Sequence, residues 1–508
     1  MGVLAQFSWT DYLLALPMTL LTLFALGILL IDFMLPAEMK WANAVTAFVG
    51  VMFATAGVVK IQLWMNANNA PGSLGMMRTL LVDRFAIYFF YLFLAATAIA
   101  ILMSVRYMEI EHENHGEYYA LMLLSVVGMM CMAAGFDIVL IFIGLELMAI
   151  STYVLVGFLR RDRRSNEAAL KYLLLGAFSS GIFAYGLSLL YGLTGSTNLA
   201  VIASQLAKIL QSSQYKPIAL VALLTTITGL LFKIAAVPFH QWAPDAYEGA
   251  PTSITGFMSV AVKAAGWAML LRILLWGLLP LRPVWVPLLV FVAIATMTGA
   301  NFAALTQSNT KRLLAYSSIA HVGYMLLGLV AGTPTQLSPD GIKGILIYLL
   351  VYTFMNLGAF GVIASLRQRA VIGDELDDLN GLYSRAPVEA VLMLLFMLSL
   401  AGIPPLAGFW GKYFIFLSLI GTAHYTLAAL GVLYSVFGLY YYLKIANAMF
   451  MGKPEEREVL PVSWTMRAGL SLAAMATLYI GIMPDRFIQL VNWALGIAQS
   501  PAVAKLVR

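Results

Sequence analysis

Four ionisable side chains stand inside long apolar runs of the sequence: Glu146, Lys233, Lys263 and Lys412. A charged side chain at the centre of a bilayer costs about 2.5–3.5 kcal/mol on insertion scales, so it is rarely kept there without a role. Burial favours the neutral form of a lysine, and a nearby carboxylate favours the charged form. A lysine would therefore bind or release a proton as its carboxylate partner approaches or withdraws. The pattern predicts an ion or proton path, with Glu146 as the counter-ion of a lysine.

Three further residues are candidates for the same path. Lys171 stands near the start of an apolar run, where it either takes part in proton transfer or extends to the membrane surface as an anchor. His240 and His321 are either relays or hydrogen-bonded packing residues, and His321 has polar neighbours at helical spacing. These neighbours are Ser317, Ser318 and Tyr324. A polar stripe of this kind would hold water beside His321.

The alternative for the buried charges is a structural role in static ion pairs. Such a pair between Glu146 and a lysine would hold two helices together without moving a proton. Applied to Lys233, Lys263 and Lys412 together, this explanation needs three buried acids. The apolar runs contain one clear mid-membrane acid, Glu146. The sequence therefore favours the proton path.

Acidic residues in two more polar stretches are expected to have plainer roles. Asp245 and Glu248 follow Lys233 in the chain, and we expect them to cap the next helix or to contact a partner. A second group is expected to form a solvated loop face that also suits docking. Its members are Asp374, Glu375, Asp377 and Asp378.

The composition indicates a polytopic membrane protein. Of the 508 residues, 61% are hydrophobic and 11% are charged, whereas a soluble domain has about 25% charged residues. The formal net charge of +6 lies largely in short loops and is no signal for nucleic acid. The single cysteine, Cys131, excludes an intrachain disulfide, a multi-cysteine zinc site and an all-cysteine iron–sulfur site. With no phosphate loop, dinucleotide fingerprint or haem motif, we expect no metal and no redox cofactor on this chain.

Because about 20 apolar residues span a bilayer, the sequence predicts an all-α protein of about fourteen transmembrane helices. The first run, Tyr12–Met34, is too long for a signal peptide and has no basic region before it. The fourth and fifth runs are nearly continuous and divide near Gly135–Asp137. The predicted spans are 12–34, 41–65, 83–105, 118–135, 137–158, 167–192, 217–240, 251–278, 284–305, 312–331, 341–366, 387–420, 424–450 and 464–484.

Two of the predicted spans contain helix-breaking prolines at matching places. Pro238 interrupts the seventh span just after Lys233, and Pro404-Pro405 interrupt the twelfth just before Lys412. The two breaks lie five spans apart, which predicts two repeats of five helices each. Because five is an odd number of membrane crossings, the second repeat starts on the opposite side of the membrane and is inverted. Inverted repeats with broken helices at corresponding positions are typical of transporters. The predicted division is 1–115 for helices 1–3, 116–280 for the first repeat, 281–450 for the second, and 451–508 for helix 14 and the tail.

The basic loops predict the orientation in the membrane. The strongest cluster is Arg160–Arg164, which we place in the cytoplasm. Alternation puts three more basic stretches on the same side: Lys311-Arg312, Arg367–Arg385 and Lys453–Arg457. Both termini are then outside. The acidic loop Glu109–Glu117 also falls on the cytoplasmic side, but acidic residues count little in this rule.

Four stretches carry a family resemblance: GLELMAISTYVLVGF, FKIAAVPFHQWAPDAYEGAPTSITGFMSVAVKAAG, NTKRLLAYSSIAHVGYMLLG and GIPPLAGFWGKYFIF. From about Gly116 to Phe450 the chain resembles subunit N of bacterial respiratory complex I (NADH–quinone oxidoreductase), an antiporter-like protein of the membrane arm. The sister subunits M and L resemble this chain in fold, but the sequence motif DAYEGAPTSIT and the chain length are more similar to those of subunit N.

The resemblance implies fourteen helices, two inverted five-helix repeats and broken helices 7 and 12. Residue by residue, it implies that Glu146 is the carboxylate of helix 5 and Lys171 the base of helix 6. It likewise implies that Lys233 is the lysine of helix 7, Lys263 the central lysine, and Lys412 the lysine of helix 12. Protons would then be taken up near the break in helix 7, pass Lys263 and His321 (and His240 if it is a relay), and leave beyond the break in helix 12.

The function implied by the resemblance is proton translocation in the bacterial inner membrane, coupled to quinone reduction elsewhere in the complex. FMN, iron–sulfur clusters and quinone are then expected on other subunits, and the partners are M-, K-, J-, A- and L-like subunits of the membrane arm. A subunit of a multi-component sodium–proton antiporter would share the fold and the lysines. A transporter of organic solutes would need a solute pocket, which a line of single lysines does not provide, and a purely structural subunit leaves the buried lysines unexplained.

Overall fold

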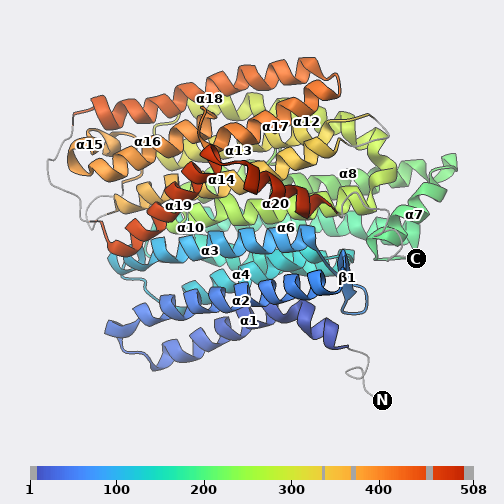
Figure 1. Ribbon diagram of the computed structural model, residues 1–508, viewed down its shortest axis with the longest axis horizontal. Helices are drawn as coiled ribbons and strands as arrows, with labels where there is room; N and C mark the ends of the chain where they lie inside the picture. The colour runs from blue at the N-terminus through green and yellow to red at the C-terminus, as the bar shows by residue number, and fades with distance from the viewer. Residues whose placement is uncertain (1–7, 334–337, 368–372, 454–461, 497–508) are drawn as a thin grey trace.

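The computed structural model describes residues 8–333, 338–367, 373–453 and 462–496 as a bundle of roughly parallel helices (Figure 1). Within these residues, thirteen helical segments are long and apolar enough to cross a membrane. The first six are α1 (Trp9–Met34), η2 with α2 (Ala37–Met39, Trp41–Ala67), α3 (Arg84–Ile110), α4 (Gly116–Ala134), α5 (Ile138–Val156) and α6 (Arg163–Thr194).

The later long segments include several that are not plain α-helix. In chain order they are η3 with α8 (Ser213–Tyr215, Lys216–Lys233), α10–η4–α11–η5 (Thr252–Phe257, Met258–Val262, Lys263–Arg272, Ile273–Gly277), η6 with α12 (Leu279–Leu281, Arg282–Leu305), α13 (Thr310–Val330), α14 (Pro339–Ser365), α18 (Tyr425–Met451) and α19 (Trp464–Ile482). The segments η4 and η5 are π-helical.

Two shorter apolar helices, α16 (Pro387–Ala401) and α17 (Ala407–Gly421), together form the remaining predicted span, the twelfth. The helical membrane fold predicted from the sequence is thus confirmed. The predicted divide between the fourth and fifth helices is also confirmed, since α4 ends at Ala134 and α5 begins at Ile138.

The two predicted breaks have the local geometry that proline imposes. A proline ring clashes with the carbonyl four residues earlier and offers no N–H. Accordingly, α8 ends at Lys233, ahead of Pro238, and the chain resumes as the short helix α9 (Trp242–Gly249). The residue Ala235, inside this break, has φ of +59°. The break is therefore wider than the single point at Pro238 that the sequence suggested.

In the second break, glycine takes the left-handed position. Gly402 has φ of +89° and ends α16, and α17 starts five residues later at Ala407. A left-handed residue just past a helix end is the usual position for glycine, because it has no Cβ to clash. Both broken helices thus leave backbone carbonyls free of helical partners.

Several small elements were not predicted. A β-hairpin, β1 (Gly72–Gly75) with β2 (Leu80–Asp83), joins α2 to α3 in an antiparallel register. The amphipathic α7 (Leu199–Ile209) follows α6, and α20 (Asp485–Leu495) follows α19. Short turns of helix also occur at η7 (Asp377–Leu379) and α15 (Leu382–Arg385). The described chain is otherwise helical, so these elements modify the all-α prediction only locally.

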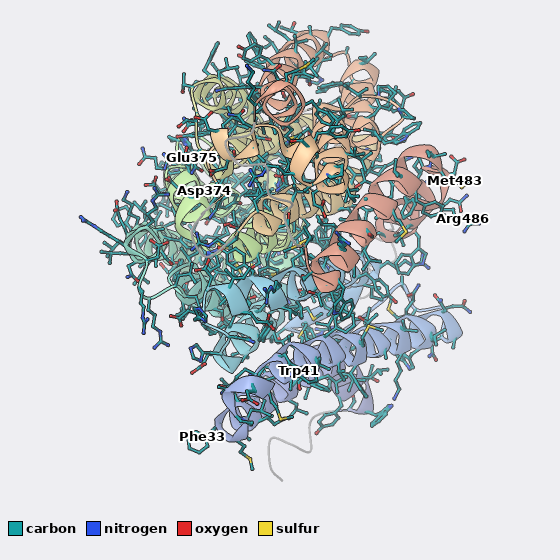
Figure 2. The ribbon with its side chains drawn as sticks, turned by 90° about the vertical axis from the view of Figure 1, so that its left-hand side faces the viewer. Phe33, Trp41, Asp374, Glu375, Met483 and Arg486 are labelled. Carbon is teal, nitrogen blue, oxygen red and sulfur yellow. The ribbon has the colours of Figure 1, made fainter. Side chains whose placement is uncertain are left out.

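The burial pattern places the charged core at the centre of the bundle. In their most apolar windows, the segment Thr252–Gly277 and helix α13 are each 94% buried, whereas α1 is 33% buried. At the edge of the bundle, Phe33 is 93% exposed and Trp41 is 49% exposed. Figure 2 shows both at one end of α1 and α2, on the side of the molecule that also carries Asp374 and Glu375. Large exposed apolar residues on a helix of this length suit contact with lipid or another subunit.

Candidate functional site

Lys233 is the last residue of α8 and is only 4% exposed. Its ammonium group lies 5.8 Å from the ring centre of Tyr153 and 5.7 Å from that of Tyr172. Those two rings meet edge to face at 4.6 Å. Aromatic faces attract a cation while making no proton-accepting salt bridge with it. Lys233 therefore stands at the break with aromatic rather than carboxylate neighbours.

Glu146 lies near Lys233 but does not form an ion pair with it. The two charges interact electrostatically, yet no described carboxylate lies within 4.0 Å of the Lys233 ammonium group. One carboxylate oxygen of Glu146 is buried and has no hydrogen-bond partner among the described residues. This geometry is that of a counter-ion held at a distance. The predicted role of Glu146 in tuning Lys233 stays a prediction.

Lys263 begins α11 directly after the π-helical segment η4. It is 3% exposed and donates a hydrogen bond of 2.9 Å to the carbonyl oxygen of Ser318, and a second to the Ser318 hydroxyl. Gly266, one turn later, lies beside the end of α8, since a Cβ there would lie 3.1 Å from the Cγ2 of Ile234 and 3.6 Å from the Cγ of Lys233. Single π-helical turns commonly occur at functional sites.

His321 sits in a hydrogen-bonded group of hydroxyls and is 2% exposed. Its Nδ1 pairs with the hydroxyl of Tyr348, and its Nε2 lies 2.9 Å from the hydroxyl of Tyr442. Tyr442 also shares a hydrogen bond with Ser317. The polar stripe predicted on this helix is therefore buried, and Ser318 in the same stripe holds Lys263. Each hydroxyl both donates and accepts, which is what a proton relay requires.

Lys412 lies in α17 and is 6% exposed. Its ammonium group donates a 2.7 Å hydrogen bond to the carbonyl of Ala401, the last residue of α16, and lies 5.2 Å from the ring centre of Tyr324. A helix C-terminus carries a partial negative charge and unpaired carbonyls, so it stabilises a cation. The break in helix 12 thus supplies the acceptor for Lys412.

Four lysines are buried among the described residues; Lys311, at the start of α13, binds the carbonyls of Glu248 and Ala250, and the other three share one property. Among the described residues, no carboxylate lies within 4.0 Å of the ammonium group of Lys233, Lys263 or Lys412. The buried ion pair that the chain does form lies elsewhere, between Arg272 and Asp83, which are 1% and 2% exposed at their side chains. The static ion pairs considered as an alternative are therefore not the arrangement at these lysines.

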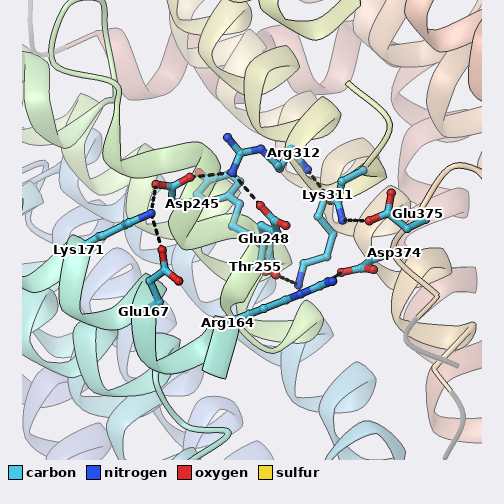
Figure 3. Close-up of polar contacts among 12 residues, drawn as sticks. Arg164, Glu167, Lys171, Asp245, Glu248, Thr255, Lys311, Arg312, Asp374 and Glu375 are labelled. Carbon is cyan, nitrogen blue, oxygen red and sulfur yellow. Dashed lines mark hydrogen bonds and ion pairs between the residues drawn. The ribbon is translucent and has the colours of Figure 1, made fainter. Parts of the chain in front are cut away.

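Lys171 differs from the other lysines, because its side chain is 45% exposed and makes two ion pairs. It lies 2.8 Å from Glu167 and 3.0 Å from Asp245. Arg312 in turn lies 2.6 Å from Asp245 and 2.7 Å from Glu248. Figure 3 shows this chain of contacts, which joins α6, α9 and α13. Lys171 is thus an exposed residue that pairs with Glu167 and Asp245, whereas no ion pair joins it to Glu146 among the described residues.

The expectations for the acidic stretches need correction. Asp245 and Glu248 lie within α9 and bind Arg312, so they do not cap the following helix. Burial raises the pKa of Asp245, but hydrogen bonds from Arg312 and Lys171 lower it more, and the net pKa is below its usual range. The carboxylate stays charged because two cations hold it.

The predicted acidic loop face is also only partly solvated. Asp374 is 3% exposed and lies 3.8 Å from Arg164, while Glu375 accepts a 3.1 Å hydrogen bond from Asn309. Asp377 is the exposed member of the group. The sequence did not indicate this burial, because the partners of these acids lie far away in the chain.

His240 lies half-buried in the break after Lys233, and no described contact joins it to the buried lysines.

The residues that the sequence analysis missed are mostly aromatic: Tyr153, Tyr172, Trp242, Tyr348 and Tyr442. An aromatic side chain in an apolar run carries no signal of its own, because such a residue can equally pack helices or face lipid. Across the described residues, no group of three or more His, Cys, Asp and Glu side chains is placed to hold a metal ion.

Two broken helices, together with buried lysines that have no carboxylate within ion-pairing distance among the described residues, define an antiporter-like membrane protein. A family profile described as "NADH:quinone oxidoreductase/Mrp antiporter, TM" matches residues 134–438. A chain of respiratory complex I from Thermus thermophilus superposes with a TM-score of 0.75 at 31% identity, covering 93% of this chain and 98% of that one. A chain of the Mrp complex from Dietzia superposes with a TM-score of 0.80 at 21% identity, which shows likeness of fold alone.

The particular family follows from a curated relative. The chain is 64% identical to NADH-quinone oxidoreductase subunit N 1 of Koribacter versatilis over 504 residues, which is 99% of this chain and 98% of the relative. The chain belongs to the subunit N family of NADH–quinone oxidoreductases.

Proposed function

We propose that this chain moves protons across the bacterial inner membrane as an antiporter-like membrane-arm subunit of an NADH–quinone oxidoreductase. The observation that carries the proposal is the set of three buried lysines, Lys233, Lys263 and Lys412, with no carboxylate within ion-pairing distance among the described residues. A permanently charged lysine without a partner is costly in such an environment. A lysine that loses and regains a proton avoids that cost for part of the cycle.

The proposed route uses the hydrogen bonds and close contacts between these lysines. A proton on Lys233 passes toward Lys263, whose helix α11 packs against the end of α8 at Gly266. Lys263 hands it to Ser318 and the adjoining hydroxyls, and His321 with its tyrosine partners connects them to Lys412. Glu146 sets the proton affinity of Lys233 through its distance. The outward step has to do work against the membrane potential, about 2.3 kcal/mol per charge for each 100 mV, so the two halves must never open together.

The proposed orientation places the end that carries Arg164, Lys311 and Arg312 in the cytoplasm. Figure 3 shows these basic residues close together, and Asp374, which lies 3.8 Å from Arg164, is on the end of the molecule that Figure 2 views. Helix α1 begins, and α20 ends, toward the opposite side of the molecule (Figure 1). That arrangement agrees with both termini being outside. The loop Lys453–Arg457, which the sequence analysis also placed in the cytoplasm, lies mostly outside the described residues.

The proposed partners are the other membrane-arm subunits, similar to the M, K, J, A and L subunits, with FMN, iron–sulfur clusters and the quinone site on other chains. A multi-component sodium–proton antiporter is the second candidate, because the Mrp chain shares the fold. The high identity to a subunit N relative favours the first.

The experiment that separates the two candidates is purification of the intact complex from its native membrane. We expect co-purification with subunits that carry flavin and iron–sulfur clusters, and NADH-dependent quinone reduction by the pure complex. Co-purification with small membrane subunits alone, together with exchange of sodium for protons in proteoliposomes, would contradict the proposal and support the antiporter.

A further inference from the structure

A polar pocket of about 190 Å³ opens at the end of the bundle that carries the basic loops. Six charged side chains line it: Arg164, Glu167, Lys171, Asp245, Glu248 and Arg312. One water occupies about 30 Å³ of liquid, so the pocket has room for several. Its charged lining suits water, and it lies beside α9, the helix that resumes after the break at Lys233.

Two stacked rings pack beside Lys233, on the two helices α6 and α9 that also line the pocket. Tyr172 follows the pocket residue Lys171 on α6 and is fully buried. Its ring lies against the Trp242 ring with centres 4.5 Å apart and planes 12° apart. Tyr172 also lies near Lys233, whose ammonium group is 5.7 Å from the ring centre of Tyr172. Tyr172 thus has the lysine within reach on one side, while its sequence neighbour faces the pocket.

The Trp242 ring is fixed to the end of α8. Its Nε1 donates a 2.9 Å hydrogen bond to the carbonyl of Phe232, the residue before Lys233, and its ring lies 5.6 Å from that of Phe232. Trp242 is 2% exposed. Packed aromatic rings with few polar atoms exclude water, and without water a proton has no carrier between the pocket and the lysine.

The same two helices that carry the rings also carry the ion pairs of the pocket. Lys171 and Tyr172 are neighbours on α6, and Trp242 and Asp245 lie one turn apart on α9. The Lys171–Asp245 pair therefore holds together the two helices whose rings are stacked. Gly249 brings the helices close, because a Cβ there would lie 2.4 Å from the Cβ of Ala168 on α6.

A second set of contacts holds α9 from the opposite side. Arg312 on α13 binds both Asp245 and Glu248, and Lys311 donates hydrogen bonds of 2.6 Å and 2.7 Å to the carbonyls of Glu248 and Ala250. Those carbonyls lie at the C-terminal end of α9, which attracts a cation. Separation of α9 from α6 thus requires the ion pairs to rearrange.

We propose that the stacked pair Tyr172–Trp242 is the gate for proton uptake from the charged pocket to Lys233, and that the Lys171–Asp245–Arg312 ion pairs hold this gate closed. The pocket is then the uptake site. The proposal rests on the proposed function, since it presupposes that Lys233 carries protons. It assigns Lys171 to holding the gate closed rather than to carrying the proton deep in the membrane.

The first test measures water access behind the gate directly. A reporter cysteine at Phe232, in a Cys131→Ser background, is labelled with a small charged methanethiosulfonate in the purified complex in nanodiscs. We expect faster labelling when the ring is removed in Tyr172→Leu or the ion pair is broken in Asp245→Asn. Tyr172→Phe is the matched control, because it keeps the ring and loses only the hydroxyl, and it should label like the parent. Equal labelling rates in the parent and in Tyr172→Leu would overturn the gate.

The second test measures coupling in proteoliposomes that contain the complex. A gate that cannot close lets protons slip back, so Tyr172→Leu and Asp245→Asn should lose part of the proton-to-electron ratio while quinone reduction continues. Tyr185→Leu is the control, because Tyr185 is an exposed tyrosine on the same α6, and it should keep the parent ratio. A loss in Tyr172→Phe equal to that in Tyr172→Leu would mean that the hydroxyl transfers the proton, which overturns the gate.

A Lys233→Ala complex measured beside them keeps the two proposals apart. A reduced ratio in Lys233→Ala with parent ratios in the gate variants refutes the gate alone. A parent ratio in Lys233→Ala refutes the proposed function.

Discussion

Replacing Gly402 by alanine tests whether the break in helix 12 exists to place Lys412. Gly402 has φ of +89° and ψ of +34°, and a residue with a side chain pays about 1–2 kcal/mol in this left-handed region. The new Cβ would lie 2.9 Å from the Cδ and 3.3 Å from the Nζ of Lys412, so the lysine has to move. Movement breaks the 2.7 Å hydrogen bond to the Ala401 carbonyl, a charge-assisted bond worth about 1.5–3 kcal/mol.

Backbone strain and the lost hydrogen bond together raise the free energy of the folded protein with a charged Lys412 by about 2.5–5 kcal/mol, or roughly two to four powers of ten in an equilibrium constant. We expect Gly402→Ala to assemble but to pump fewer protons per electron, measured in proteoliposomes with the purified complex. Gly421→Ala is the matched control, because Gly421 lies in the same α17 and a Cβ there meets nothing within 4 Å.

A double variant shows whether the effect of Gly402→Ala runs through the lysine. If it does, Gly402→Ala combined with Lys412→Ala should be no worse than Lys412→Ala alone, since coupled sites are not additive. Two results would refute the reasoning: a parent ratio in assembled Gly402→Ala, or an equal loss in Gly421→Ala.

Three further predictions concern other charges. Lys263→Arg should assemble with a reduced proton-to-electron ratio, because a guanidinium group does not deprotonate in a protein; a parent ratio would rule out a deprotonating relay at this position. Asp83→Asn should lower the Tm of the purified complex, because a lone buried charge on Arg272 costs about 3–5 kcal/mol; an unchanged Tm would argue against this clamp between α3 and α11. In the folded protein, hydrogen bonds from Arg312 and Lys171 hold the pKa of Asp245 below its usual range, so the stability that this carboxylate contributes is fully present above its unfolded pKa and is lost only as the pH falls through the lower folded pKa. The pH profile of pumping between about pH 6 and pH 8 should therefore keep its midpoint in Asp245→Asn, and a shifted midpoint would show that Asp245 titrates in this range.

The sequence predicted the helices well because each span needs its own apolar run, which a local pattern records. It also located both breaks, since Pro238 and Pro404-Pro405 act on the backbone beside them. The exact helix ends depended on left-handed residues, Ala235 and Gly402, whose conformation the pattern does not specify. The hairpin between α2 and α3 was missed because it is short and its pairing is set by packing on the bundle.

The sequence indicated the charged residues of the candidate site as candidates, but it did not indicate the residues that surround them. A lysine in an apolar run can be recognised from the sequence because a charged residue is rare there. The tyrosines around His321 cannot be told from other aromatic residues of an apolar helix. The partners of Asp245 and Asp374 also lay beyond reach, because Arg312 and Arg164 come from helices distant in the chain. Such pairs are fixed by how helices pack, which one sequence does not reveal.

The central claim is that Lys233 carries protons that the complex pumps. The most direct test is the proton-to-electron ratio of a fully assembled Lys233→Ala complex in proteoliposomes, with subunit content checked by gel and quinone reduction measured alongside. We predict a ratio clearly below that of the parent complex, because the removed side chain is the buried base at the break in helix 7. A ratio equal to that of the parent in an assembled, active complex would contradict the account.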